Sequence, residues 1–160
     1  MKVFITGISR GIGLALAEAM LQEKMEVYGT VRNLNNGDMN GVKDLKKQFH
    51  QKLHLIKLDV TQENVKEQII QHIPQDLVLD LLINNAGVYH KESEPALERL
   101  SKENIKDSLH VNLLGPILVT QALLPYLMNS ENPKVANISS ILGSVQLNAT
   151  FSSSYDYRVS

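Results

Sequence analysis

The start of the chain places three glycines where a phosphate group could bind. Residues 3–5 form a short apolar run, Gly7, Gly11 and Gly13 follow it, and an amphipathic run covers residues 12–21. This order predicts a strand, a tight glycine loop and a helix. The first turn of a helix offers unpaired N–H groups and a positive dipole end, which attract phosphate. The spacing G-x-x-x-G-x-G differs from the commoner G-x-G-x-x-G, and taken alone it is equally compatible with a plain strand-to-helix turn.

Polar or glycine residues also follow the other four predicted strands. They are Arg32, Asp59, the run Asn84-Asn85-Ala86-Gly87 and the pair Ser139-Ser140. Ligands of an open parallel sheet bind outside the carboxyl ends of its strands. Each of these residues alone could be ordinary turn chemistry, because Asp, Asn, Ser and Gly are common in loops. The five strand ends together favour a nucleotide cleft.

Strand-like and helix-like segments alternate along the chain. The predicted strands cover residues 3–6, 27–31, 53–58, 78–83 and 134–139. The predicted helices cover residues 12–23, 42–50, 62–72 and 101–129, the last bent where Pro116 removes an N–H group. This pattern predicts an α/β fold with a doubly wound, Rossmann-like parallel sheet and right-handed crossovers. The length of 160 residues favours a single domain.

Composition excludes several other classes of protein. The formal net charge of -1 implies no strong attraction to nucleic acid or an anionic membrane, and the chain has no cysteine. His50 and His54 are four residues apart, but a strand is predicted to begin between them, so we expect no metal site. The apolar run from Leu113 to Met128 is interrupted by glycine, glutamine and proline, and falls short of a membrane span. The first strand starts at residue 3 and leaves no room for a targeting peptide, so we expect a cytoplasmic protein.

Taken in order, these motifs resemble the short-chain dehydrogenase/reductases, within them the carbonyl-reductase-like group that includes the C-factor and Sniffer proteins. The family's cofactor loop T-G-x-x-x-G-x-G stands at residues 6–13, and its D-V pair is Asp59-Val60. Its N-N-A-G motif occupies residues 84–87, its helix asparagine is Asn112, and its fifth-strand motif is the run 137–140. Each motif is loose by itself, but all of them in this order make a specific signal that runs from residue 1 to about 157.

The resemblance implies a dinucleotide bound along these motifs. Its phosphates would lie on the loop residues Gly7, Ser9, Arg10, Gly11, Ile12 and Gly13, its adenine near Asp59 and Val60, and its nicotinamide and attached ribose near Asn85, Ala86 and Gly87. The second strand ends in Thr30-Val31-Arg32, which offers no acid for a ribose 2′-hydroxyl and one guanidinium for a 2′-phosphate. We therefore expect NADP (NADPH) rather than NAD, with Arg10 as a second contact. The alternative is that Arg32 is a solvated loop residue.

By the same resemblance, the family reduces a carbonyl by hydride transfer while a tyrosine gives a proton to the oxygen. Ser140 corresponds to the serine that hydrogen-bonds this oxygen, and Asn112 to the asparagine that supports a proton relay. Two tyrosines compete for the donor role. Four residues after Tyr155 stands Val159, whereas four residues after Tyr157 is position 161, where the family has a lysine. We therefore expect Tyr157 to be the donor and the chain to be truncated just before that lysine.

Two functions remain open from the sequence. The first is an NADP-dependent oxidoreductase for a small-molecule carbonyl, impaired in this form because no lysine lowers the pKa of the Tyr157 phenol. The second is a non-catalytic NADP-binding module or isoform that acts through a partner. The domain 1–160 would lack its C-terminal strands, which leaves the fifth strand as an edge and the helix over 105–127 partly uncovered. We therefore expect self-association, and a homo-oligomer in the full-length form.

Overall fold

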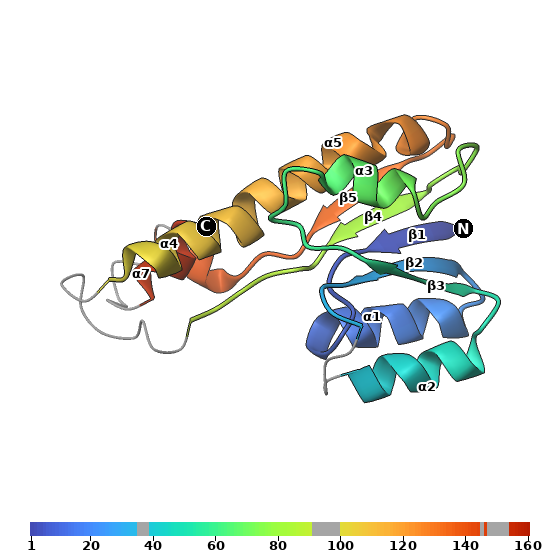
Figure 1. The fold of residues 1–160 in the computed structure, drawn as a ribbon, viewed down its shortest axis with the longest axis horizontal. Coiled ribbons are helices and arrows are strands. Elements are labelled where there is room, and N and C mark those ends of the chain that lie inside the picture. The colour runs from blue at the N-terminus through green and yellow to red at the C-terminus, as the bar shows by residue number, and fades with distance from the viewer. Residues whose placement is uncertain (35–38, 91–99, 145, 147–153) are drawn as a thin grey trace.

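The computed structural model describes residues 1–34, 39–90, 100–144, 146 and 154–160, and it forms one five-stranded parallel sheet (Figure 1). The strands stand in the order β3-β2-β1-β4-β5. Their bounds are β1 Lys2–Ile5, β2 Glu26–Val31, β3 Leu53–Lys57, β4 Leu81–Asn84 and β5 Lys134–Asn137. The predicted doubly wound, Rossmann-like α/β sheet is confirmed. The chain changes direction across the sheet between β1 and β4, so a cleft is expected at their carboxyl ends.

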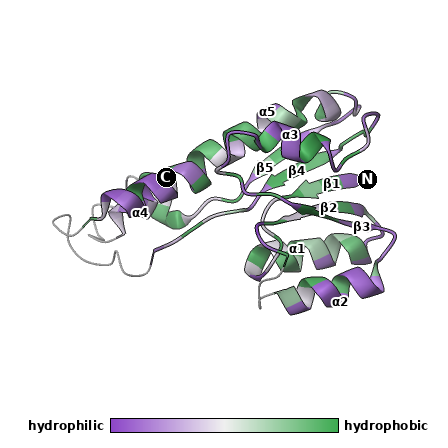
Figure 2. Ribbon diagram, viewed as in Figure 1, coloured by the Kyte–Doolittle hydropathy of each residue, from purple (hydrophilic) through white to green (hydrophobic). Residues whose placement is uncertain are grey.

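Helices cover both faces of the sheet (Figure 1). Helices α1 (Gly11–Gln22) and α2 (Asn40–Gln48) lie on one face, and α3 (Val65–Ile70) and α5 (Gly115–Leu127) lie on the other. The alternation of side chains along β1 serves both layers, because Val3 and Ile5 are buried in the α1–α2 core and Phe4 in the α3–α5 core. Figure 2 shows hydrophobic residues along the central strands and along much of α5.

The fourth strand begins later than the apolar pattern predicts. We expected a strand over 78–83, whereas β4 covers Leu81–Asn84. Leu79 is fully buried, but its N–H donates to the Tyr126 carbonyl at 3.1 Å rather than to a strand. Val78 is 41% exposed. The apolar run therefore includes residues that pack onto α5 before the sheet starts, which periodicity cannot separate from the strand itself.

The long predicted helix is one helical run with an irregular turn inside it. It consists of α4 (Lys102–Leu109), a π turn η4 (His110–Leu114) and α5, and the Gly115 N–H donates to the His110 carbonyl five residues earlier. The departure from α geometry lies directly before Pro116, because a proline perturbs the turn that precedes it. Among the described residues, Lys102–Leu127 is the one helix long and apolar enough to cross a membrane by length and composition. Its α5 part nevertheless packs on the sheet as a core helix, with Val119 and Leu123 fully buried.

Strand β5 forms an outer edge of the sheet, as expected. Val135 on this strand is 46% exposed, and apolar side chains along the neighbouring helix are also exposed, among them Leu113, Leu114, Ile117 and Leu124. After β5 the described chain forms a short 3-10 turn η5 (Ile141–Gly143) and, at its end, a single helical turn α7 (Tyr155–Arg158). Figure 1 shows α7 beside α4, at the end of the molecule away from the amino ends of the strands.

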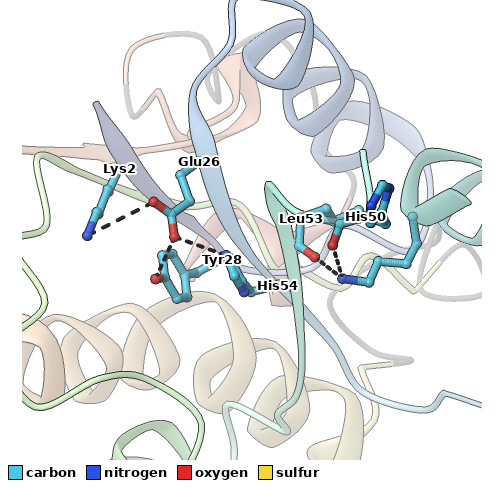
Figure 3. Close-up of polar contacts among 7 residues, drawn as sticks. Lys2, Glu26, Tyr28, His50, Leu53 and His54 are labelled. Carbon is cyan, nitrogen blue, oxygen red and sulfur yellow. Dashed lines mark hydrogen bonds and ion pairs between the residues drawn. The ribbon is translucent and has the colours of Figure 1, made fainter. Parts of the chain in front are cut away.

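A polar cluster joins the first three strands at the end of the sheet opposite the glycine loop (Figure 3). Its centre is the Glu26 carboxylate, which accepts a hydrogen bond from the Tyr28 hydroxyl at 2.9 Å and lies 3.0 Å from His54 Nε2. The rings of Tyr28 and His54 stack with centroids 4.6 Å apart. Burial, and then the hydrogen bond and negative charge of Glu26, raise the pKa of the Tyr28 phenol well above its usual range.

Candidate active site

The glycine loop between β1 and α1 turns where a side chain would be strained. Gly7 has φ +72° and Gly11 has φ +60°, in the left-handed region that favours glycine. The Gly7 N–H donates to Thr30 Oγ1 at 3.1 Å, and the Ile8 N–H donates to the Thr30 carbonyl at 2.9 Å. The end of β2 therefore fixes the loop. A Cβ built on Gly11 would meet no atom within 4 Å, so the loop opens toward free space there.

The N-terminus of α1 is arranged to receive negative charge. The residue before the helix, Arg10, has extended backbone and makes no side-chain capping bond. The first turn of α1 contains no acidic residue. A helix start of this kind suits an anionic ligand, and the open space at Gly11 gives a phosphate room to approach it.

The loop after β4 is bound directly to the glycine loop. Asn85 Nδ2 donates to the carbonyls of Thr6 at 2.9 Å and Gly7 at 3.0 Å. In return, Thr6 Oγ1 accepts hydrogen bonds from the backbone N–H groups of Asn85 at 2.9 Å and Ala86 at 3.0 Å. Thr6 is 2% exposed, and its partners Asn85 and Ala86 are half-buried. The two loops at the point where the strand order reverses are thus joined by four hydrogen bonds into one wall.

A cavity of about 360 Å³ lies along this wall. Every residue that the sequence suggested for cofactor binding lines it: Gly7, Ser9, Arg10, Gly11, Ile12, Gly13, Arg32, Asp59, Val60, Asn85, Ala86 and Gly87. The sequence reasoning assigned no role to Thr30, which also lines the cavity. Thr30 is 1% exposed, and its partner, the Gly7 N–H, lies 23 residues away in the chain, so no local pattern points to this contact.

Three charged side chains of the described residues line this cavity: Arg10, Arg32 and Asp59. Arg10 and Arg32 are both exposed and line it from the glycine loop and from the end of β2. Asp59, after β3, accepts hydrogen bonds at Oδ1 from the Thr61 N–H at 3.0 Å and from Thr61 Oγ1 at 2.7 Å. The Asp59 side chain is therefore held in place at the far side of the cavity. Among the described residues that line this cavity, two guanidinium groups thus stand against one carboxylate.

A second cavity of about 920 Å³ adjoins the first. The three predicted catalytic residues, Asn112, Ser140 and Tyr157, all line it. Its wall includes residues that also line the smaller cavity, namely Ile12, Asn85, Ala86, Gly87 and Val88. Tyr155, the competing tyrosine, is absent from the described residues that line either cavity. The structure therefore brings the predicted catalytic set and the predicted cofactor set together at one edge of the sheet.

Asn112 and Ser140 are both held by local hydrogen bonds. Asn112 lies in the π turn, where its Oδ1 accepts from the Val88 N–H at 2.8 Å and its Nδ2 donates to the Val88 carbonyl at 3.0 Å. Nδ2 also donates to Ser160 Oγ at 2.9 Å. Ser140 Oγ accepts from the Leu142 N–H at 3.2 Å. The π turn thus directs one amide onto both the loop after β4 and the end of the chain.

No group of three or more metal-binding side chains occurs within the residues that the structure describes.

Tyr157 lies on α7 with its ring edge-on to that of Tyr89, at a centroid distance of 5.1 Å and an interplanar angle of 77°. Tyr89 lines the larger cavity as well, and the sequence reasoning missed it. An aromatic residue two positions after Gly87 carries no local signal of such a contact, because its partner is 68 residues away in the chain.

Comparison with known proteins agrees with this geometry. The family model described as short chain dehydrogenase matches residues 1–155. Short-chain dehydrogenase RED3 of Pyricularia oryzae is 33% identical over 147 residues, which cover 90% of this chain and 58% of the relative. This chain spans about half the length of the curated relatives it matches.

Solved structures share the fold over almost the whole chain. NADPH-bound carbonyl reductase from chicken fatty liver superposes with a TM-score of 0.87 at 25% identity, over 99% of this chain and 67% of that one. Carbonyl reductase Sniffer of D. melanogaster gives 0.86 at 28% identity, over 99% and 68%. Because the family model matches nearly all of the sequence, the chain belongs to the short chain dehydrogenase family.

Proposed function

We propose that this protein is an NADP-dependent oxidoreductase that reduces the carbonyl group of a small molecule. One observation carries the proposal: the cavity lined by Asn112, Ser140 and Tyr157 shares a wall with the cavity along the glycine loop. A dinucleotide that extends from one to the other would bring its reactive end to these three side chains. The membership in an oxidoreductase family supports this reading.

NADP is the cofactor that the residues of the smaller cavity fit best. The open space at Gly11 and the uncapped start of α1 suit a pyrophosphate. Arg32, with Arg10, would bind a ribose 2′-phosphate, because a guanidinium pairs well with phosphate oxygens. The chicken carbonyl reductase with the same fold is a complex with NADPH, which agrees with this choice.

The side chains around the larger cavity supply the proton chemistry. When bound, the reduced nicotinamide would supply a hydride to the carbonyl carbon. Tyr157 would donate its phenolic proton to the carbonyl oxygen. Ser140 would hydrogen-bond the same oxygen, and Asn112 would hold the loop at Val88 and support the proton relay.

The remaining properties are proposals about the whole protein. We propose that residues 1–160 act as one dinucleotide-binding domain. The exposed apolar side chains of Leu113, Ile117 and Leu124, next to the edge strand β5, support a homo-oligomer. Sedimentation velocity over a range of concentrations would test this association. We propose a cytoplasmic location.

Deuterium transfer tests the reaction directly, even when turnover is slow. The 160-residue chain is incubated with a stoichiometric amount of NADPH deuterated at the transferred position and a reactive dicarbonyl. Mass spectrometry should find one deuterium in the alcohol, and Tyr157→Phe and Ser140→Ala should each slow its appearance by about a hundredfold or more. Saturable NADPH binding without any deuterated alcohol would overturn the reductase and leave a binding module.

A further inference from the structure

Tyr89 is held between the loop after β4 and the turn that carries Tyr157. Its backbone follows Val88, which Asn112 fixes with two hydrogen bonds. Its ring meets the Tyr157 ring edge-on at 5.1 Å, a favoured arrangement for an aromatic pair. Its hydroxyl lies 3.0 Å from Ser154 Oγ, within hydrogen-bond distance. Tyr89 therefore contacts both the proton donor proposed above and the residue that begins its helical turn.

Ser154, which the Tyr89 hydroxyl contacts, has an unusual backbone conformation. Its φ is +57°, in the left-handed region that non-glycine residues rarely adopt, and it is 4% exposed. The Ser154 carbonyl accepts hydrogen bonds from the N–H groups of Tyr157 at 3.1 Å and Arg158 at 2.9 Å. Ser154 is therefore the N-cap residue of α7. Strained backbone of this kind persists only where the surroundings hold it in place. The Tyr89 hydroxyl is one of the groups that does so.

The other end of α7 is fixed from the π turn. Ser160 Oγ accepts from Asn112 Nδ2 at 2.9 Å and donates to the Tyr157 carbonyl at 2.9 Å. The four-residue turn is thus held at its start by Tyr89 and at its end by Asn112. A turn this short has little stability of its own, so its contacts with the rest of the chain determine where the Tyr157 ring stands. The Tyr89 and Asn112 contacts act there together with the hydrogen bond from Arg158 Nη1 to the Leu142 carbonyl at 3.1 Å.

We infer that Tyr89 is a positioning residue for Tyr157: it sets the phenol at the wall of the larger cavity through the Tyr89–Tyr157 ring contact and the Tyr89–Ser154 hydroxyl contact. The inference rests on the proposed function for its catalytic consequence, but its structural part stands apart from it. Tyr89 is itself 39% exposed, so replacing it opens no cavity in the core. The ring contact and the hydroxyl contact can be removed separately.

Tyrosine resonances test the structural part without any reaction. The 160-residue chain is prepared with ring-labelled tyrosine, and the Tyr157 signal is assigned from Tyr157→Phe. Tyr89→Leu should shift the Tyr157 ring signals, because it removes a neighbouring aromatic ring, whereas Tyr89→Phe should restore most of their position. Ser154→Ala should behave like Tyr89→Phe, and the matched control Tyr155→Phe should leave the Tyr157 signals in place. Unchanged Tyr157 signals in Tyr89→Leu would overturn the inference.

Deuterium transfer tests the catalytic part. Tyr89→Leu should slow single-turnover transfer by about a hundredfold, the size expected for a donor displaced by an ångström. Its affinity for NADPH should stay within about twofold of wild type, because a positioning role acts on the chemical step. A loss of NADPH affinity equal to the loss of rate would show a merely structural role and overturn the inference. If the wild type binds NADPH and transfers nothing, the proposed function fails, and the resonances still decide whether Tyr89 positions Tyr157.

Discussion

Asn85 leaves no room for a side chain on Gly13. A Cβ on Gly13 would stand 2.4 Å from Asn85 Nδ2 and 2.3 Å from the Gly7 carbonyl oxygen, far inside van der Waals contact. The same Asn85 amide binds the Gly7 carbonyl at 3.0 Å. The third glycine of the loop is therefore required by packing between α1 and the loop after β4, whereas Gly11 is the one that opens to the cavity.

Gly13→Ala should destabilise the fold and impair cofactor binding together. The added methyl must displace backbone, a strain of about 1–3 kcal/mol in the free energy of unfolding. Urea unfolding and NADPH titration would measure both effects. Gly143→Ala is the matched control, because its Cβ would meet nothing nearer than Ser139 Oγ at 4.0 Å. Equal stability of the two variants would contradict this packing argument.

Thr6→Val should lower the free energy of unfolding, although valine and threonine have nearly the same shape. The change preserves volume but leaves the part-buried N–H groups of Asn85 and Ala86 without the Thr6 hydroxyl. Each unsatisfied buried donor costs about 1–3 kcal/mol, so we expect a loss of that order in the free energy of unfolding and weaker NADPH binding. Thr6→Ser keeps the hydroxyl and serves as the control. If valine and serine variants unfold at the same urea concentration, the hydroxyl does not hold the two loops together.

Tyr28 should make the stability of the protein sensitive to alkaline pH. The pKa of its phenol is raised in the folded state by burial and by Glu26, so the folded protein retains a proton that the unfolded chain loses above about pH 10. The stability that Tyr28 contributes is therefore fully present below that pH and is lost as the pH rises further. Tyr28→Phe should be less stable than wild type by about 1 kcal/mol at neutral pH, from the lost bond to Glu26.

The difference between wild type and Tyr28→Phe should shrink above about pH 10. Thermal unfolding of both proteins across this range would measure it, with Tyr155→Phe as a control that also removes one phenol. A difference that stays constant up to the highest pH at which the protein folds would contradict the argument from Glu26.

The sequence predicted the sheet well because the five strands alternate with helices and each ends in a polar or glycine residue. It misplaced the start of β4, because Leu79 is as apolar as a strand residue and yet packs beside Tyr126. The π turn over His110–Leu114 was also not predicted, since one extra residue in a turn leaves the apolar pattern almost unchanged. Local sequence patterns could not predict the start of β4 or the π turn, because both depend on packing between distant segments.

The residues of the candidate site also fall into those that the sequence predicted and those that it did not. The residues suggested for cofactor binding line one cavity because strand ends of a parallel sheet meet at one edge. Thr30 and Tyr89 were missed because their partners, the Gly7 N–H and the Tyr157 ring, are far away in sequence. Such contacts follow from the fold and leave no spacing in the sequence.

The preference between NADPH and NADH tests the account most directly. Fluorescence titration of the 160-residue chain should show NADPH binding at least about tenfold tighter than NADH, since a guanidinium–phosphate contact is worth about 1.5–3 kcal/mol. Arg32→Ala should remove most of that preference by weakening NADPH and leaving NADH unchanged. Lys66→Ala, which removes an exposed positive charge on α3, should keep it. Equal affinity of the wild type for both cofactors, or an undiminished preference in Arg32→Ala, would contradict the assignment of this cavity to NADP.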